Sequence, residues 1–378
     1  MTRIPFNVPP VGGRELEYLA RVFEQRAISG NGIFTERCHA WLQERLGVRD
    51  ALLTHSCTAA LEMAAILARI EPGDEVIMPS FTFSSTANAV VLRRGVPVFI
   101  DIRPDTLNID EYLIEPAITP RTKAICAVHY AGICAEMDMI VNIARRHQLL
   151  VIEDAAQALL STYRGRPAGA LGDFGCFSFH ETKNAVTGEG GALTLNDPAL
   201  AERAYVIWEK GTNRRALKLG QVDKYSWVDY GSSFLPSELT AAVLFAQFEG
   251  IEGFNAKRCA IWEHYHASFA DLEAAELIRR PSVPSHCVHN GHLYYLLLED
   301  TATRDSLIAR LQADEIWAPF HYIPLHSAEA GRRYARAHGS LHVTDSVSSR
   351  LLRLPMHADM SLASADRVIE RVHAHLRR

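Results

Sequence analysis

Residues 149–157 read LLVIEDAAQ, and this stretch decides the fold. It opens on an apolar run, which is typical of a strand that is buried on both faces of a sheet. The run ends in two adjacent carboxylates, Glu153 and Asp154. Because successive side chains of a strand point to opposite faces, one carboxylate can face a ligand while the other faces away. A carboxylate in this place could cap a helix, pair with an arginine, or keep a pyridine nitrogen protonated.

The segments on the N-terminal side of this strand repeat the same pattern. Short apolar runs alternate with stretches of helical periodicity, which indicates an α/β fold with a mostly parallel sheet covered by helices on both faces. Such sheets bind ligands at the carboxyl ends of their strands. We expect strands at 51–53, 75–79, 96–101, 124–129 and 149–153, with helices at 58–70, 83–94 and 136–147.

The second half of the chain has a different pattern. A polar stretch at 210–229 mixes basic and aromatic residues, and a long helix is expected at about 237–269. We place a domain boundary on this helix near residue 250, which gives a large domain at 1–250 and a small C-terminal α/β domain at 251–378. The elements expected in the small domain are a strand at 294–298, a helix at 304–313, a strand at 316–320 and a helix at 363–376.

The composition is that of a soluble globular protein. Of the 378 residues, 48% are hydrophobic and 22% are charged, and the formal net charge of −5 gives no reason to expect nucleic-acid binding. No apolar run approaches the roughly 20 residues that span a bilayer, and residues 1–10 lack the pattern of a secretory signal. The seven cysteines include no C-x-x-C pair, which favours reduced thiols in a cytoplasmic protein.

Residues 176–184, CFSFHETKN, place a lysine shortly after another expected strand. Lys183 in a partly apolar site would have a lowered pKa and could act as an amine nucleophile, although a solvated surface lysine is the alternative. The glycines of residues 188–191, GEGG, permit close approach of the backbone to a ligand. Residues 180–183, HETK, lack the second histidine of a zinc-binding H-E-x-x-H motif, so we expect no metal site.

Two further segments place ligand-binding residue types after expected strands. Residues 55–60, HSCTAA, open a helix, and the N–H groups at a helix N-terminus suit a phosphate. A plain N-cap by Ser56 or Thr58 is the alternative. Phe81 and Phe83 follow the strand at 75–79, where either could stack on a flat ring or both could belong to the core.

Taken together, these segments resemble the pyridoxal-phosphate (PLP) dependent sugar aminotransferases of the DegT/DnrJ/StrS family, which have fold type I. The resemblance begins at residues 28–32, ISGNG, and extends to Leu362. Its most specific motifs are EDAAQ at 153–157 and S-F-x-x-x-K at 178–183, the latter followed by GEGG. The resemblance implies a large, mixed and mostly parallel sheet domain of the aspartate aminotransferase type, a smaller C-terminal α/β domain, and a homodimer with shared active sites.

The resemblance also implies roles for the residues that match family motifs. Lys183 would carry PLP as a Schiff base and later move a proton. Asp154 would pair with the pyridinium nitrogen, and Gln157 would lie beside the phenolic oxygen. Phe83 would stack on the ring, with Phe81 as the alternative. The phosphate would be bound by Thr58, Ala59 and Ser178.

The sequence departs from the family at residues 231–235, GSSFL, where many relatives have Gly-x-Asn-x-Arg. In those relatives the Asn reaches the cofactor phosphate of a partner subunit. Ser233 stands at the Asn position and Leu235 at the Arg position. Ser233 could still donate a hydrogen bond, so we include it among the cofactor-binding residues.

The implied reaction transfers an amino group from L-glutamate to a nucleotide-linked keto-sugar. Stretches 5–7, 75–79, 176–184, 211–214, 221–225 and 320–326 are most similar to family members of enterobacterial common antigen synthesis, which convert dTDP-4-dehydro-6-deoxy-D-glucose into dTDP-4-amino-4,6-dideoxy-D-galactose. The sequence leaves other 3-keto and 4-keto acceptors open. The candidate substrate-binding residues are Arg214, Lys224, Tyr225, His321, Tyr322 and His326. A solvated face is the alternative for the basic stretch, and a satisfied core histidine is the alternative for each His.

Three other classes of protein fit the sequence less well. A PLP-dependent sugar dehydratase of the same family commonly has His in place of Lys183. A PLP-binding regulator without turnover would not need the intact set of residues. An NAD-dependent nucleotide-sugar oxidoreductase is disfavoured because no G-x-G-x-x-G follows the first expected strand.

Overall fold

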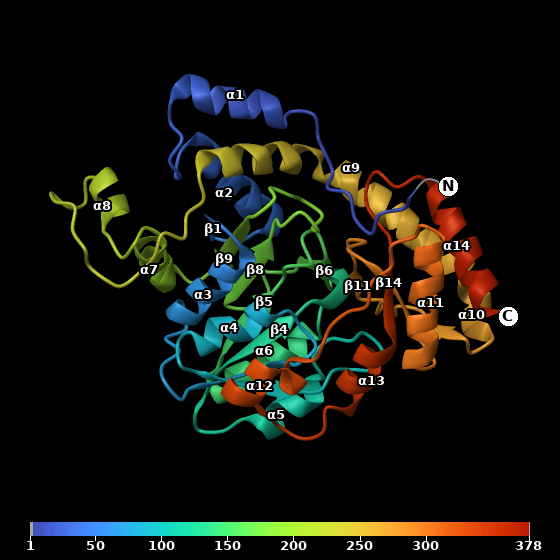
Figure 1. Cartoon of the computed structure of the whole chain (residues 1–378). Coiled ribbons are helices and arrows are strands. Elements are labelled where there is room, and N and C mark those ends of the chain that lie inside the picture. The colour runs from blue at the N-terminus through green and yellow to red at the C-terminus, as the bar shows by residue number, and fades with distance from the viewer. Residues whose placement is uncertain (1–2, 378) are drawn as a thin grey trace.

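The computed structural model of the protein describes residues 3–377 and contains a central eight-stranded sheet (Figure 1). Strand β9 alone runs against the other seven, so the sheet is mixed and mostly parallel, and the predicted fold class is confirmed. In order across the sheet the strands are β1 (Asp50–Thr54), β9 (Gly191–Leu195), β8 (Phe174–Ser178), β5 (Leu150–Asp154), β4 (Thr122–Val128), β2 (Glu75–Pro79), β3 (Val96–Ile100) and β13 (Arg336–Ala337).

Helices cover both faces of this sheet, as the alternating sequence pattern predicts. Two separate clusters of buried apolar side chains lie on the two faces, because the strands are apolar on both. The first cluster takes residues from α1 (Glu15–Gln25), α2 (Ile33–Leu46), α5 (Ile114–Ala117), α6 (Met137–His147) and the start of α9 (Glu238–Ser268). The second takes residues from α3 (Cys57–Leu67), α4 (Ser84–Val91) and α7 (Pro198–Trp208).

A third apolar cluster lies in the C-terminal part of the chain, around a three-stranded sheet of β10 (Ile278–Arg279), β12 (Tyr294–Leu298) and β14 (Leu351–Leu354). Helices α11 (Thr301–Ala313) and α14 (Leu362–Leu376) pack on this sheet (Figure 1). The remaining C-terminal helices are α10 (Ala270–Ala274), α12 (Glu329–Tyr334) and α13 (His342–Arg350). No helix within residues 3–377 combines the length and the apolarity that a bilayer crossing requires.

Helix α9 crosses the boundary predicted near residue 250 without a break. Its residues up to Ile251 join the first apolar cluster, and its residues from Ile261 onward join the third. Two short segments each pack against the part of the chain that lies far from them in the sequence. Ile4 packs in the C-terminal cluster, and β13 adds a strand to the edge of the large sheet. The division at residue 250 therefore stays a prediction.

The predicted strand at 316–320 is wrong. Ile316 and Phe320 each form only an isolated bridge, to Ile4 and Leu352 respectively. Pro319 lies between them and has no N–H group to donate to a ladder, so a regular strand is interrupted there.

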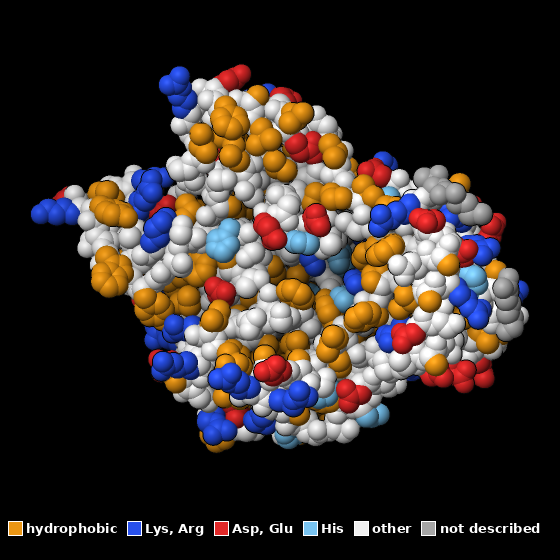
Figure 2. Space-filling view, in the orientation of Figure 1, with side chains coloured by type: hydrophobic (Ala, Val, Ile, Leu, Met, Phe, Trp, Pro, Cys, Tyr) orange, Lys and Arg blue, Asp and Glu red, His pale blue; other side chains and the backbone are white. Residues whose placement is uncertain are grey.

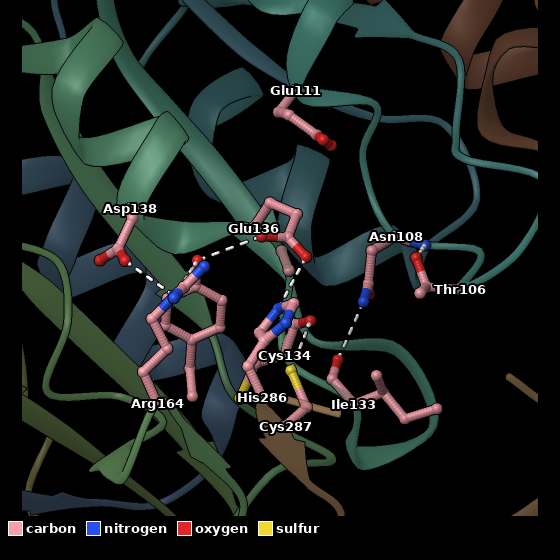
Figure 3. Close-up of polar contacts among 12 residues, drawn as sticks. Thr106, Asn108, Glu111, Ile133, Cys134, Glu136, Asp138, Arg164, His286 and Cys287 are labelled. Carbon is pink, nitrogen blue, oxygen red and sulfur yellow. Dashed lines mark hydrogen bonds and ion pairs between the residues drawn. The ribbon is translucent and has the colours of Figure 1, made fainter. Parts of the chain in front are cut away.

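A polar cluster fastens the segment before β12 to the large sheet domain (Figure 3). Strand β11 (Cys287–Val288) pairs with β6 (Thr162–Tyr163), which also pairs with β7 (Arg166–Pro167). Beside this pairing, His286 Nε2 lies 2.8 Å from a carboxylate oxygen of Glu136, and the hydroxyl of Tyr163 donates to the other oxygen at 3.1 Å. These contacts hold the C-terminal part of the chain against the carboxyl ends of the central strands.

Glu75 at the start of β2 makes a second connection between distant segments. Its fully buried carboxylate accepts hydrogen bonds from Thr119, from Arg121 at 2.6 Å and from two nitrogens of Arg336 at 2.8 and 3.1 Å. The hydrogen bonds from Arg336, with those from Arg121 and Thr119, lower the pKa of Glu75 from its ordinary 4.5 to about 2. The contact fixes β13 at the edge of the sheet.

We predict that Glu75→Gln lowers the free energy of unfolding at neutral pH by about 2–4 kcal/mol, because the buried carboxylate loses its charge-assisted hydrogen bonds with Arg121 and Arg336. The folded-state pKa is depressed, so this stabilisation is present above pH 4.5 and is lost as the pH falls towards 2. Thermal melts at a series of pH values should therefore show a difference between variant and wild type that shrinks through this window. Exposed Glu71→Gln is the control, and an equal effect of both changes would contradict the prediction.

Candidate active site

A cavity of about 800 Å³ opens at the carboxyl ends of the central parallel strands, between the large sheet and the C-terminal part of the chain. Figure 2 shows this hollow near the middle of the molecule, with basic and histidine side chains visible inside it. Of the residues predicted as site residues, those that line the cavity are Thr58, Phe83, Asp154, Gln157, Ser178, Lys183, His321 and Tyr322.

The two carboxylates that end β5 face opposite sides of the sheet, which confirms the expectation from strand geometry. Glu153 is fully buried and accepts backbone N–H bonds from Gly169, Leu171 and Gly172 at 2.6–2.8 Å, and His129 Nε2 lies 2.8 Å away. Its task is structural.

Asp154 faces the cavity instead. Thr86 Oγ1 donates to Asp154 Oδ2 at 2.7 Å, and the Ala156 N–H donates to Oδ1 at 3.2 Å. Only 6% of the residue is exposed. A buried carboxylate with few donors and no basic partner among the described residues suits a positively charged group on a ligand.

Lys183 follows β8 in a turn whose backbone is fixed by the bond from its N–H to the carbonyl of His180 at 2.9 Å. Its half-buried side chain lines the cavity. Burial lowers the pKa of Lys183, and the charge of Arg353 lowers it further, while Asp154 acts in the opposite direction. An amine with a lowered pKa is unprotonated more often at neutral pH, which is the state that attacks carbonyl carbon.

Hydroxyl groups gather at the N-terminus of α3. Ser56 is the N-cap, and its Oγ accepts from the Ala59 N–H at 3.1 Å. Thr58 Oγ1 lies 2.7 Å from Ser85 Oγ. Ser56, Thr58, Ser85 and Ser178 all line the cavity. Ala59 does not, since it is buried, and its N–H is bonded to Ser56. The N-terminal end of α3 presents hydroxyls and a positive dipole end to the cavity, which suits a phosphate.

The two phenylalanines after β2 have different places. Phe83 is 61% exposed and lines the cavity. Phe81 is only 1% exposed and packs edge-on against Tyr130, with ring centroids 5.0 Å apart. The alternative assignment of Phe81 as the stacking residue is therefore wrong, because its ring belongs to the core.

A hydrogen-bonded set on the other wall of the cavity includes Gln157, His321 and Tyr322. Gln157 accepts from the Ala131 N–H at 2.7 Å and donates to the Tyr322 hydroxyl at 3.0 Å, while His321 Nδ1 lies 3.1 Å from the Tyr130 hydroxyl. Burial lowers the pKa of His321 well below its ordinary value, so its imidazole is neutral at pH 7.

His326, in contrast, is placed outside the cavity lining. Its Nδ1 lies 2.8 Å from Ser80 Oγ, and its Nε2 lies 3.2 Å from a carboxylate oxygen of Asp345. The His326 N–H also donates to Ser80 Oγ at 3.0 Å. These contacts anchor the segment that carries His321 and Tyr322, which is a positioning task.

Four predicted residues lie apart from the cavity of their own chain. Arg214 is in α8 (Arg214–Lys218), which projects from the body of the molecule (Figure 1), and Lys224 and Tyr225 follow in the same arm. Ser233 is exposed and forms an isolated bridge with Glu209. The single chain does not bring these residues to Lys183.

Among the cavity residues that the sequence reasoning missed are the basic residues Arg258, His292 and Arg353. Each comes from the C-terminal half, where no motif of the large domain points to it. A signal did exist for Arg353, since residues 351–354, LLRL, place one charge inside an otherwise apolar strand.

The comparison with known proteins agrees with this geometry. A protein-family model described as the DegT/DnrJ/EryC1/StrS aminotransferase family matches residues 10–373. This chain belongs to that family. The predicted resemblance is therefore confirmed over nearly the whole chain, and the cofactor of this DegT/DnrJ/EryC1/StrS aminotransferase is pyridoxal phosphate, as expected.

Individual relatives in the family align with almost the whole length of this chain. GDP-perosamine synthase from Caulobacter vibrioides is 35% identical over 374 residues, which cover 98% of this chain and 97% of the relative. The crystal structure of the aminotransferase TlmJ from Streptoalloteichus hindustanus is 31% identical, covers 100% of this chain and 99% of its own, and has a TM-score of 0.91. NtdA from Bacillus subtilis with bound cofactor PMP is 28% identical, with a TM-score of 0.88 and coverage of 100% and 86%.

The cavity residues fit the cofactor of the family. PLP presents an aldehyde, a phosphate and a pyridine nitrogen, and the cavity offers a lysine of lowered pKa, hydroxyls at a helix N-terminus and a buried carboxylate. The lysine follows β8, the hydroxyls lie at the start of α3 and the carboxylate ends β5, and these three elements are neighbours in the fold.

Proposed function

We propose that this aminotransferase transfers an amino group from L-glutamate to C4 of dTDP-4-dehydro-6-deoxy-D-glucose, giving dTDP-4-amino-4,6-dideoxy-D-galactose. The single observation that carries the aminotransfer is the meeting of Lys183 and the buried Asp154 in one cavity of a chain of this family. The choice of sugar is supported by the similarity of residues 176–184, 211–214 and 320–326 to enzymes of that substrate. GDP-perosamine synthase, as a relative, makes a GDP-linked keto-sugar the second candidate acceptor.

When bound, PLP withdraws electrons from the carbon next to the amine, which makes a proton on that carbon acidic. In our proposal Lys183 holds the cofactor and then moves this proton on its Nζ, and its lowered pKa suits that exchange. The Asp154 carboxylate keeps a proton on the ring nitrogen. The hydroxyls of Thr58 and Ser178 would donate hydrogen bonds to the phosphate, and the positive end of the α3 dipole would stabilise its negative charge.

The rest of the cavity would orient cofactor and sugar. Phe83 would cover one face of the ring, and its exposure in the cavity leaves its own ring free to stack. Gln157 would lie beside the phenolic oxygen, held by its bonds to Ala131 and Tyr322. His321 and Tyr322 would face the sugar, where a neutral imidazole and a hydroxyl can accept and donate hydrogen bonds.

We further propose a homodimer in which the arm of one subunit completes the site of the other. Arg214, Lys224 and Tyr225 would contact the nucleotide, and Ser233 the cofactor phosphate. Support comes from the apolar side chains that the arm leaves uncovered in the single chain, including Trp227 at 78% exposure and Leu219 at 58%. Arginine next to aromatic side chains is a combination that binds a diphosphate and stacks on a base.

We predict that Arg214→Glu raises KM for the sugar nucleotide by about 10- to 100-fold and changes kcat much less, because the contact is remote from the reacting carbon. Steady-state kinetics with L-glutamate at saturation measure this. Lys123→Glu, which makes the same charge change on exposed β4 surface, is the control. An unchanged KM for the Arg214 variant would count against the role of the arm.

The test of the proposed function is a visible absorption spectrum recorded in three stages. The PLP-loaded protein should be yellow, L-glutamate should bleach it, and dTDP-4-dehydro-6-deoxy-D-glucose should restore the colour. Bleaching without recovery would overturn this acceptor, and a GDP-linked 4-keto-sugar would then be tried in the same cuvette. Absence of any yellow form after addition of PLP would overturn the role of Lys183.

A further inference from the structure

His292 lies in the wall of the cavity and has no role in the mechanism proposed above. The residue is only 7% exposed, and it lines the same cavity as Lys183. Arg258 of α9 fixes the main chain on both sides of it, because the guanidinium donates to the carbonyl of Gly291 at 3.1 Å and to that of His292 itself. The imidazole is therefore carried by a rigid part of the wall.

The hydrogen bonds of Asn184 decide which nitrogen of His292 carries the proton. Asn184 Nδ2 donates to the carbonyl of Asn290 at 2.8 Å and to Asn255 Oδ1 at 3.0 Å. Since a carbonyl can only accept, the other atom of the Asn184 amide is its acceptor oxygen. This oxygen lies 3.0 Å from His292 Nδ1, which must therefore donate. In a neutral imidazole the second nitrogen, Nε2, is then an acceptor.

The surroundings keep the imidazole of His292 neutral. Burial lowers the pKa of His292 well below its ordinary value, and the charges of Lys183, Arg258 and Arg353 lower it further. A second proton on the ring would add a charge to a place that is already basic. The Nε2 lone pair is thus available at neutral pH.

This nitrogen is open to the cavity. Nε2 of His292 forms no hydrogen bond with the part of the chain that the structure describes, and it is not one of the fully enclosed side-chain atoms that lack a partner there. Because the residue is otherwise enclosed and borders the cavity, the surface that Nε2 retains faces that space. An acceptor in such a wall is satisfied when a ligand brings a donor.

The charges near Nε2 restrict the kind of donor that it can accept from. A carboxylate or a phosphate has no proton to offer at neutral pH, and Lys183 with the two arginines would repel an ammonium group. A neutral hydroxyl meets neither obstacle. L-Glutamate has no alcohol hydroxyl, whereas the keto-sugar has one on C3, the carbon next to the reacting carbonyl.

We propose that Nε2 of His292 accepts a hydrogen bond from the C3 hydroxyl of the keto-sugar, and so selects acceptors that carry a hydroxyl beside the carbonyl. This inference rests on the proposed aminotransfer and adds a residue that determines sugar specificity. The bond from His292 to Asn184, the residue after Lys183, holds the imidazole near the amine that acts at C4. A C3 hydroxyl is then the sugar hydroxyl that comes within its reach.

The experiment compares dTDP-4-dehydro-6-deoxy-D-glucose with its 3-deoxy analogue, so that general damage to the site cancels in the ratio of the two rates. The second-order rate of colour recovery from the pyridoxamine form should be about 10- to 100-fold lower for the analogue in the wild type. In His292→Asn this ratio should fall below about 3-fold, because the short amide can still donate to Asn184 but puts no acceptor at the Nε2 position.

Two further variants make the comparison specific. His292→Gln puts its amide near the place of Nε2, so an acceptor oxygen is regained, and part of the preference for the C3 hydroxyl should remain. His342→Asn makes the same change as His292→Asn on a side chain that is 79% exposed, and it should keep the full wild-type ratio. A full ratio in His292→Asn, or no preference in the wild type, overturns the inference.

A second readout does not depend on turnover. The sugar nucleotide dTDP-6-deoxy-D-galactose has the C3 hydroxyl but no carbonyl, and it should raise the melting temperature of the wild-type holoenzyme more than its 3-deoxy analogue does. This difference should vanish in His292→Asn and persist in His342→Asn; its persistence in both variants contradicts the inference. If the keto-sugar fails to restore the colour of the wild type, the proposed acceptor is wrong, and the melting temperatures, measured also with the GDP-linked pair, still decide the role of His292.

Discussion

We expect the replacement of Lys183 with Ala to lower kcat by at least about 10⁴-fold, because the change removes both the amine proposed to attack and the group proposed to move the proton. Thermal stability should change little, since the side chain is only half buried and its Nζ makes no hydrogen bond among the described residues. The yellow colour of the lysine-bound cofactor should be lost, while PLP can still bind non-covalently.

The readout for this variant is mass spectrometry after borohydride reduction, which fixes the cofactor to whichever lysine carries it. In the wild type we expect the cofactor on the peptide that contains Lys183. Lys257→Ala removes an exposed lysine of α9 and should leave both colour and kcat unchanged. Turnover of Lys183→Ala at the wild-type rate would contradict the assignment of Lys183 as the lysine that carries PLP.

The second large effect is expected at Asp154. Asp154→Asn keeps the size of the side chain and one acceptor oxygen, but removes the negative charge opposite the ring nitrogen. We expect kcat to fall by about 10²- to 10³-fold, which is the usual loss when one preorganised electrostatic contact is removed. Melting temperature should fall only slightly, because Thr86 can still donate to the remaining oxygen.

The neighbouring carboxylate provides the matched control. Glu153→Gln puts an NH₂ group against backbone N–H donors of the 169–172 loop, so buried donors face each other. We expect it to cost about 2–4 kcal/mol of stability while the folded fraction keeps its kcat. The two variants should thus separate activity from stability. If Glu153→Gln lost kcat and Asp154→Asn lost mainly stability, the assignment of Asp154 to the cavity side of the sheet would be wrong.

The strand, the two carboxylates and the lysine could be predicted because each is encoded locally. An apolar run followed by Glu153 and Asp154 puts the two side chains on opposite faces through the period of a strand, whatever the partners are, and the family resemblance assigned Asp154 to the ligand. The position of Lys183 is also encoded locally, because this lysine follows the expected strand after only a few residues. The fold class followed from the repetition of such runs along residues 51–153.

The two arginines that line the cavity could not be predicted in that way. Arg258 and Arg353 lie 95 positions apart, on a helix and a strand of different parts of the chain, and only packing brings them together. Phe81 and Phe83 are equally aromatic and two positions apart, so periodicity puts them on the same side. Phe83 is already the N-cap of α4, so the strand period no longer applies there; Phe81 lies in the core and Phe83 lines the cavity.

The pairing of Ile4 with the C-terminal part of the chain also sets an order of events during synthesis. The Ile4 N–H donates to the carbonyl of Glu315 at 2.8 Å, and the Trp317 N–H donates back to Ile4 at 3.0 Å. The segment around Ile4 must therefore wait for a partner that is synthesised about 310 residues later. At about 5–20 residues per second, that wait lasts roughly 15–60 s. We expect the large sheet to assemble in this interval and the C-terminal core to close afterwards.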